Sequence, residues 1–152
     1  MKREQLKVDP IKNGTVIDHI SAEKALKVIE LLNLDLSDNL LMIGMNLSSN
    51  KMDKKDIIKI ENRVLTQDEA DSIALISPSA TIIIIEDYEV VNKFSVEIPD
   101  QIKNFIICPN PNCVTNIEPV NTSFELACRN PIEVRCSYCE KKYSIDDVRF
   151  SI

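Results

Sequence analysis

The C-terminal third of the chain carries two cysteine pairs, Cys108-Pro-Asn-Pro-Asn-Cys113 and Cys136-Ser-Tyr-Cys139. Each pair presents two thiolates from one short loop, and two such loops can enclose Zn²⁺ at about 2.3 Å from each sulfur. Four thiolates leave no open coordination position, so the site would be structural and not catalytic. We therefore predict one structural Zn²⁺ per chain. The alternatives that the spacing leaves open are an iron centre of the rubredoxin type and buried or redox-active thiols.

The region that holds these cysteines is small. It has β-like segments at 105–107, 124–126, 132–134 and 143–145. About 50 residues is close to the size at which a hydrophobic core alone is insufficient and a metal or disulfide is needed. Metal binding would supply the missing folding free energy. The fifth cysteine, Cys128, is expected to be a small apolar strand residue.

The residues before Pro99 alternate between strand and helix patterns. Strands are predicted from β-branched and alternating residues at 14–20, 40–47, 56–62, 80–85 and 88–96. After the first strand, apolar residues recur at helical spacing and indicate one buried face, formed by Ala22, Ala25, Leu26, Ile29 and Leu32. We expect Ser21 to cap this helix.

A second helix is predicted to begin after Thr66, because Thr66 and Glu69 have the spacing of a capping box. Its buried face is predicted at Ala70, Ile73 and Ala74, and Pro78 helps to end it. The order is then βαββαβ plus one strand, which is the ferredoxin-like arrangement. We therefore predict an α+β protein. A ferredoxin-like domain at residues 1–99 precedes a small β-rich zinc-binding domain at residues 100–152.

Charge and hydropathy argue against several functional classes. The chain has 18 Lys and Arg against 24 Asp and Glu, and residues 101–152 hold six of each kind. A zinc-ribbon nucleic-acid-binding protein is therefore the disfavoured alternative, because phosphate contacts need local Lys and Arg density. No apolar run approaches the roughly 20 residues of a membrane-spanning helix, and residues 1–6 lack the apolar run of a signal sequence. We expect no membrane partner and a cytoplasmic, reducing location.

The N-terminal part has no recognisable catalytic motif and no glycine-rich phosphate loop. Asp18 precedes His19, but neighbouring strand residues point to opposite faces, so Asp18 is not expected to orient the imidazole as a base. His19, Lys59 and Lys93 on one sheet would make a weak anion site. A small enzyme that uses His19 or a thiolate is a third reading, but we expect no catalytic residues.

Five segments, in order along nearly the whole chain, resemble the regulatory chain of aspartate carbamoyltransferase. They are Gly14-Thr-Val-Ile-Asp-His-Ile20, Lys54-Lys-Asp-Ile-Ile-Lys-Ile-Glu-Asn62, Asp87-Tyr-Glu-Val-Val91, Cys108-Pro-Asn-Pro-Asn-Cys113 and Cys136-Ser-Tyr-Cys-Glu-Lys141. The resemblance implies a non-catalytic chain of pyrimidine biosynthesis. Its first domain would bind nucleoside triphosphates, namely CTP and ATP with UTP as a further candidate. Its zinc domain would dock on the catalytic chain, and two regulatory chains would pair through their first domains within a larger hetero-oligomer.

The resemblance also implies an effector site. Lys93 and His19 correspond to positions that contact the triphosphate, and Asp18 and Lys59 to the ribose and base end. An ammonium and an imidazole suit a polyanion.

At the base end of this implied site, main-chain groups of Ile11 and Tyr88 would read the exocyclic amino group, and Val90 lies beside them. Ile83 stands where some family members have Asn, which removes a polar contact. In the zinc domain, the family's ligands correspond to Cys108, Cys113, Cys136 and Cys139. Positions that face the catalytic chain in the family correspond to Asn110, Asn112, Glu140 and Lys141.

Overall fold

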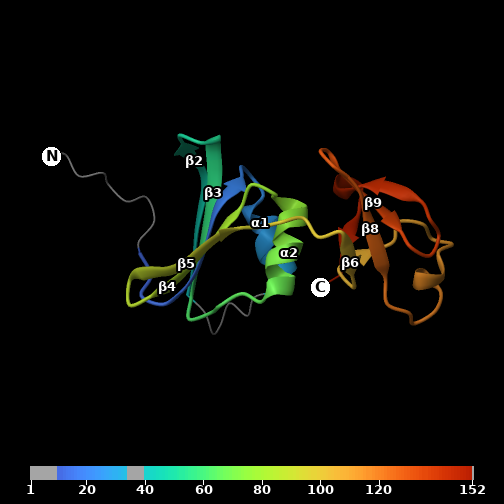
Figure 1. Ribbon diagram of the computed structural model, residues 1–152, viewed down its shortest axis with the longest axis horizontal. Coiled ribbons are helices and arrows are strands. Elements are labelled where there is room, and N and C mark those ends of the chain that lie inside the picture. The colour runs from blue at the N-terminus through green and yellow to red at the C-terminus, as the bar shows by residue number, and fades with distance from the viewer. Residues whose placement is uncertain (1–9, 34–39, 152) are drawn as a thin grey trace. The chain divides into compact units, whose positions relative to one another are not determined.

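The computed structural model describes residues 10–33 and 40–151 (Figure 1). The chain divides into two compact units, Met1–Glu97 and Ile98–Ile152. Helices occur beside antiparallel sheets, so the predicted α+β class is confirmed. Within 10–33 and 40–151, no helix has the length and apolar character that a membrane crossing requires. Residues 1–6, considered above for a signal sequence, lie outside the described residues.

The first unit follows the predicted order of elements. They are β1 (Gly14–Ser21), α1 (Ala25–Leu32), β2 (Leu41–Ser49), β3 (Asp53–Glu61), α2 (Gln67–Ile76), β4 (Thr81–Glu86) and β5 (Glu89–Ser95). The strands form one sheet in the order β2-β3-β1-β4-β5. Because β3 lies between β1 and β2, and β1 between β3 and β4, two split βαβ units interlock in the ferredoxin-like manner. Strand β5 is the additional strand, at the edge beside β4.

Helices α1 and α2 lie against the same face of this sheet (Figure 1). Ile58, Ile17 and Ile82 stand opposite one another in three neighbouring strands and are fully buried. This row forms the core under the helices. Alternation along the strands places Val16 and Lys59 on the other face, which neither helix covers.

The start of helix α1 differs from the expectation. The helix begins at Ala25, and Lys24 at its N-cap position makes no side-chain capping bond. The predicted cap by Ser21 is therefore wrong, and the Ser21 hydroxyl lies 3.3 Å from that of Ser77 instead. The buried carboxylate of Asp56 accepts a hydrogen bond from the Ala25 backbone N–H at 3.0 Å. A strand residue thus satisfies a donor that a local cap would otherwise serve.

The buried face of α1 is also narrower than predicted. Its buried residues are Ala25, Val28 and Leu32. Leu26 is 59% exposed and Ile29 is half-buried, so the prediction is wrong at Leu26. Ala22 precedes the helix. A two-turn helix that packs on one side buries a single stripe, and Leu26 falls outside it.

Helix α2 follows its prediction. Thr66 is the N-cap, and the reciprocal bonds between Thr66 and Glu69 form the expected capping box. The predicted buried residues Ala70, Ile73 and Ala74 are all buried. Arg63 forms an ion pair with Glu69 and ties the preceding loop to the first turn.

The second unit consists of short strands and two 3-10 turns. They are β6 (Gln101–Lys103), β7 (Ile106–Ile107), η1 (Val114–Asn116), β8 (Ser123–Arg129), β9 (Ile132–Cys136), β10 (Lys142–Ser144), η2 (Ile145–Asp147) and β11 (Arg149–Phe150). Its sheets have the orders β10-β9-β8-β6 and β11-β7. The fully buried side chains include Ile102, Ile106, Phe124 and Val134. Cys128 lies in β8, as expected, and is half-buried.

Candidate functional site

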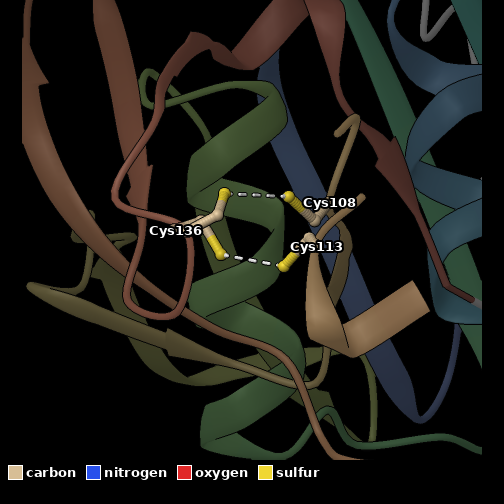
Figure 2. A group of neighbouring side chains, drawn as sticks. Cys108, Cys113 and Cys136 are labelled. Carbon is tan, nitrogen blue, oxygen red and sulfur yellow. Dashed lines mark hydrogen bonds between the residues drawn. The ribbon is translucent and has the colours of Figure 1, made fainter. Parts of the chain in front are cut away.

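The four paired cysteines come together in the second unit. Their sulfur atoms all lie within 4.8 Å of one another. Cys108 Sγ is 3.7 Å from Cys139 Sγ, and Cys113 Sγ is 3.7 Å from Cys136 Sγ. Figure 2 shows the sulfurs of Cys108, Cys113 and Cys136 converging on one point. A tetrahedral ion with sulfur ligands about 2.3 Å away requires sulfur atoms about 3.8 Å apart, so the spacing fits such an ion and excludes a disulfide.

The loops around the cluster direct hydrogen-bond donors at the sulfurs. Each sulfur accepts at least one backbone N–H from a residue two or three positions later in the chain. The donors are Asn110 to Cys108, Thr115 to Cys113, Tyr138 and Cys139 to Cys136, and Lys141 to Cys139. Donors aimed at sulfur stabilise the thiolate form, which is the form that ligates a metal.

The same surroundings perturb the acidity of the thiols. Burial raises the pKa of Cys108 to about 12. Burial also acts against ionisation of Cys139, but hydrogen bonds from the Lys141 backbone and the Asn110 side chain outweigh it and lower its pKa to about 7. Cys108 therefore needs a cation to replace its proton, whereas Cys139 ionises readily. Metal binding at such a site releases protons and couples to folding.

Two further groups near the cluster were not found from the sequence. Burial and the neighbouring thiolates of Cys108 and Cys139 raise the pKa of Tyr143 to about 12. The hydroxyl of Thr115 donates a hydrogen bond to Cys113 Sγ at 3.2 Å. Neither contact could be predicted from the sequence, because neither residue belongs to a cysteine pair.

The residues that flank the cysteine loops have different surroundings. Asn112, Glu140 and Lys141 are exposed. The side chain of Asn110 is half-buried and accepts the Asn112 backbone N–H at 3.1 Å, so it closes the first loop as well as bordering it. Three of the four expected partner positions thus present their side chains to solvent.

A cavity of about 340 Å³ opens beside the first cysteine loop. Ile107, Pro109 and Pro111 provide apolar walls, and Asp147 and Arg149 contribute charged groups. The cavity and the exposed flanking residues all belong to the second unit, so this unit presents a concave surface and charged side chains.

In the first unit, the open face of the sheet gathers several of the expected effector residues. Lys59, Val16, Ile83 and Lys93 stand opposite one another in β3, β1, β4 and β5. By alternation they share the face that the helices do not cover. Ile83 therefore lies between Val16 and Lys93. Together with Val16 it forms an apolar surface between the side chains of Lys59 and Lys93.

Strand β1 is irregular at His19. The pairing of β1 with β3 shifts between Ile17 and Ile20, and His19 has a left-handed backbone with φ of 55°. The imidazole Nδ1 lies 3.2 Å from the hydroxyl of Thr81, which is opposite Asp18 in the register. The bulge breaks the strict alternation of faces, so the expectation that Asp18 and His19 point to opposite sides does not hold here. Thr81, rather than Asp18, contacts the ring.

Positive charge concentrates around His19. Burial lowers the pKa of His19, and the nearby charges of Lys55, Lys51 and Lys93 lower it further, while Asp18 opposes them. Lys55 pairs with Asp18 at 2.8 Å. Burial works against ionisation of Asp18, but the hydrogen bonds from Lys55 and from the His19 backbone lower its pKa overall.

The sequence did not predict three residues that lie near His19, namely Lys55, Lys51 and Thr81. Lys55 could have been found, because it is four residues before Lys59 in a strand and so shares its face. Lys51 lies in the hairpin turn between β2 and β3, and Thr81 comes from a strand far along the chain. Their closeness to His19 depends on the sheet order.

At the other end of β1 lie three residues that are expected at the base end, namely Ile11, Tyr88 and Val90. Asp18, which is expected at the ribose and base end, lies beside His19 instead. The Tyr88 backbone N–H donates to the Lys12 carbonyl at 2.9 Å, which places the Tyr88 turn beside Ile11. Ile11 is buried, and Tyr88 and Val90 are exposed. Val90 is paired with Ile85 on the face that carries Lys93. The structure thus brings Lys59, Val90 and Lys93 to one side of one sheet, and places Ile11 and the Tyr88 turn at the end of β1.

Two family models match the chain. Residues 6–97 match the allosteric domain of the aspartate carbamoyltransferase regulatory chain, and residues 100–149 match its metal binding domain. A regulatory chain from Pyrococcus abyssi is 49% identical over 146 residues, which cover 95% of this chain and 96% of the relative. The chain from Thermococcus kodakarensis is 48% identical over the same length and coverage. The chain from Methanosphaera stadtmanae is 44% identical over 149 residues, or 97% of each chain. All three relatives are named aspartate carbamoyltransferase regulatory chain.

Proposed function

This chain belongs to the family of aspartate carbamoyltransferase regulatory chains, and from that premise we propose that nucleoside triphosphates bind its first domain and modulate a catalytic chain docked on its second. It is a regulatory chain with an allosteric and a metal-binding domain, and its partner is a catalytic chain. The effectors, the metal and the docking surface are the parts that we propose.

The observation that carries the effector proposal is the cationic cluster on the open sheet face. Three lysines are close enough to His19 for their charges to act on its imidazole: Lys55, Lys51 and Lys93. Clustered cations attract polyanions, and Asp18, which is paired with Lys55, offsets only part of the positive charge of the three lysines. The apolar residues between Lys59 and Lys93 give a base or ribose a flat floor. We propose that CTP, ATP and UTP are the candidate ligands, with the phosphates at His19 and Lys93.

Four thiols, three of them buried and Cys139 half-buried, have the spacing of a tetrahedral ion and support Zn²⁺ as the metal. Zinc favours four thiolates, needs no redox chemistry and has no geometric demand beyond the tetrahedron. We propose one Zn²⁺ per chain, held by Cys108, Cys113, Cys136 and Cys139. When bound, it would link the two loops and stabilise the second unit. The free thiols of all five cysteines agree with a reducing compartment, for which we propose the cytoplasm.

The partner surface is proposed on the same unit. Asn112, Glu140 and Lys141 are exposed around the cysteine loops, beside the cavity that Arg149 and Asp147 border. A surface built on two metal-closed loops is rigid only when the metal is present. We further propose that two regulatory chains pair through their first units. Nothing in the charge distribution favours nucleic acid as a partner.

Calorimetry with variants of the cationic cluster tests the effector proposal. Lys93→Ala should weaken triphosphate binding by roughly 1.5–3 kcal/mol, the usual size for a hydrogen bond to a charged group. Lys59→Ala should weaken binding of the nucleoside more than that of inorganic triphosphate. Lys54→Ala is the matched control, because alternation along β3 places Lys54 on the opposite side from Lys55 and Lys59. Unchanged affinity in both Lys93→Ala and Lys59→Ala would show that this sheet face is not the effector site.

A further inference from the structure

The 3-10 turn η1 directly follows Cys113 and folds back over the first cysteine loop. The side-chain amide of Asn116 donates to the carbonyls of Cys108 and Asn110, at 2.8 Å each. The neighbouring hydroxyl of Thr115 donates to Cys113 Sγ at 3.2 Å. Adjacent side chains of one short turn therefore act on the loop in two ways: Asn116 fixes its backbone, and Thr115 contacts a sulfur atom.

The sulfur that Thr115 contacts, Cys113 Sγ, belongs to a residue that is almost inaccessible to water. Cys113 is 1% exposed, and Cys108 and Cys136 beside it are equally shielded. Four thiolates around a divalent ion leave two excess negative charges in this enclosed space. Buried charge is costly unless hydrogen bonds compensate it. The Thr115 backbone N–H already points at Cys113, so its hydroxyl gives this sulfur a second directed donor from the same residue.

We propose that Thr115 is a positioning residue of the metal site, whose hydroxyl holds the sulfur of Cys113 in place through a hydrogen bond and slows loss of the metal. The inference rests on the proposed ligation by the four cysteines and deepens it. Groups that hydrogen-bond to metal ligands commonly change metal affinity by about 10–100-fold. The contribution of the hydroxyl to metal retention can be measured separately from packing, because valine has nearly the same volume as threonine and lacks the hydroxyl.

Zinc release from the full-length chain to an excess of chelator tests the proposal. Thr115→Val keeps the shape and removes the hydroxyl, and it should release zinc about 10–100-fold faster than the unmodified chain. Thr115→Ser retains the hydroxyl and should restore slow release. Thr122→Val is the matched control. Thr122 is half-buried in the same unit, like Thr115, and its substitution should leave the rate unchanged.

A spectroscopic measurement separates the hydrogen bond from simple packing. With Co²⁺ in place of zinc, removal of a donor from a thiolate should shift the sulfur-to-cobalt charge-transfer band to lower energy in Thr115→Val and not in Thr115→Ser. Faster release without this shift, or without recovery in Thr115→Ser, would overturn the proposal and assign the effect to packing. Wild-type release rates in Thr115→Val would also overturn it. If the unmodified chain then still holds one equivalent of zinc, the four-cysteine site is retained and only the role of Thr115 is refuted. If the unmodified chain binds no metal, both the metal site and the role of Thr115 are refuted.

Discussion

His19 illustrates how a single residue acquires its properties from the sheet around it. It is the one histidine of the sequence. Its ring reaches Thr81 because β1 bulges and the backbone turns left-handed at this position. Burial and the lysines around it lower its pKa, so the imidazole of the free protein is mostly neutral at pH 7. A bound polyanion would reverse part of that effect.

The first prediction follows from this shift. A triphosphate adds negative charge beside His19 and raises its pKa, so the protein takes up a proton on binding. Affinity should therefore increase as the pH falls towards the lowered pKa of the free imidazole, and level off once the free imidazole is itself protonated. Calorimetry at pH 7.5 and 6.0, in two buffers of different ionisation enthalpy, measures both the affinity and the proton uptake.

The γ-phosphate also titrates in this range, so a control variant is needed. His19→Asn removes the imidazole and should leave only the pH dependence of the nucleotide itself. If His19→Asn and the unmodified chain take up the same number of protons, His19 does not face the phosphates.

At the scale of elements, Asp56 ties three pieces of the first unit together. Its carboxylate is fully buried in β3 and accepts two backbone N–H groups, from Ala25 at the start of α1 and from Asn46 at the bulge in β2. These donors have distances of 3.0 Å and 2.8 Å. The next residue towards the N-terminus, Lys55, pairs with Asp18 on the other face. Strand β3 thus fixes the helix start on one side and carries part of the proposed effector surface on the other.

The second prediction concerns this tie. Asp56→Ala should lower the free energy of unfolding of the first unit by roughly 2–5 kcal/mol, because two buried N–H groups lose their acceptor and each such loss costs about 1–3 kcal/mol. Lys24→Ala, at an N-cap position without a capping bond, should change it by less than about 0.5 kcal/mol. Urea unfolding followed by circular dichroism at helical wavelengths reports on this unit, since α1 and α2 belong to it. Equal stability of the two variants would contradict the account of Asp56.

The sequence predicted those features that depend on near neighbours. The capping box of α2 was found because Thr66 and Glu69 are three residues apart, and the cysteine cluster because each pair lies in one loop. The cap of α1 was missed because its acceptor, Asp56, is 31 residues away. The bulge at His19 was missed because no glycine marks it. Such features arise from the pairing of distant strands, which local patterns do not encode.

At the scale of the whole molecule, the chain consists of two units, each with its own buried core. The first unit contains helices α1 and α2 and its own sheet, whereas the second relies on short strands and the cysteine cluster. The folding free energy of the second unit should therefore depend on metal, and that of the first should not.

The third prediction tests this difference. Removal of zinc from the full-length chain with a mercurial reagent should unfold residues from about 100 onward, because the cysteine loops lose their link. Limited proteolysis should then cleave beyond Pro99, while the helical circular dichroism and triphosphate binding of the first unit persist. Cys113→Ser should behave like the stripped chain, and Cys128→Ser should keep its zinc. Simultaneous unfolding of both units would refute the independence of the first.

Regulation links the two units through the proposed complex. An effector that binds one state of the complex more tightly must shift the equilibrium between states. Coupling free energies are typically 1–3 kcal/mol, or about 5–150-fold in affinity. The chain itself performs no chemistry in this account, so the effect should be a change in the response of the catalytic chain to aspartate.

The most direct measurement is therefore the aspartate saturation curve of a complex reconstituted from this chain, zinc and aspartate carbamoyltransferase catalytic chains, recorded with and without each nucleoside triphosphate. The account predicts that at least one triphosphate shifts the half-saturating aspartate concentration. It also predicts that Lys93→Ala raises the triphosphate concentration needed for this shift by more than about tenfold, and that the zinc-stripped chain neither assembles nor responds. A complex that forms normally but gives the same curve with every triphosphate would contradict the central claim that this chain carries the effector signal.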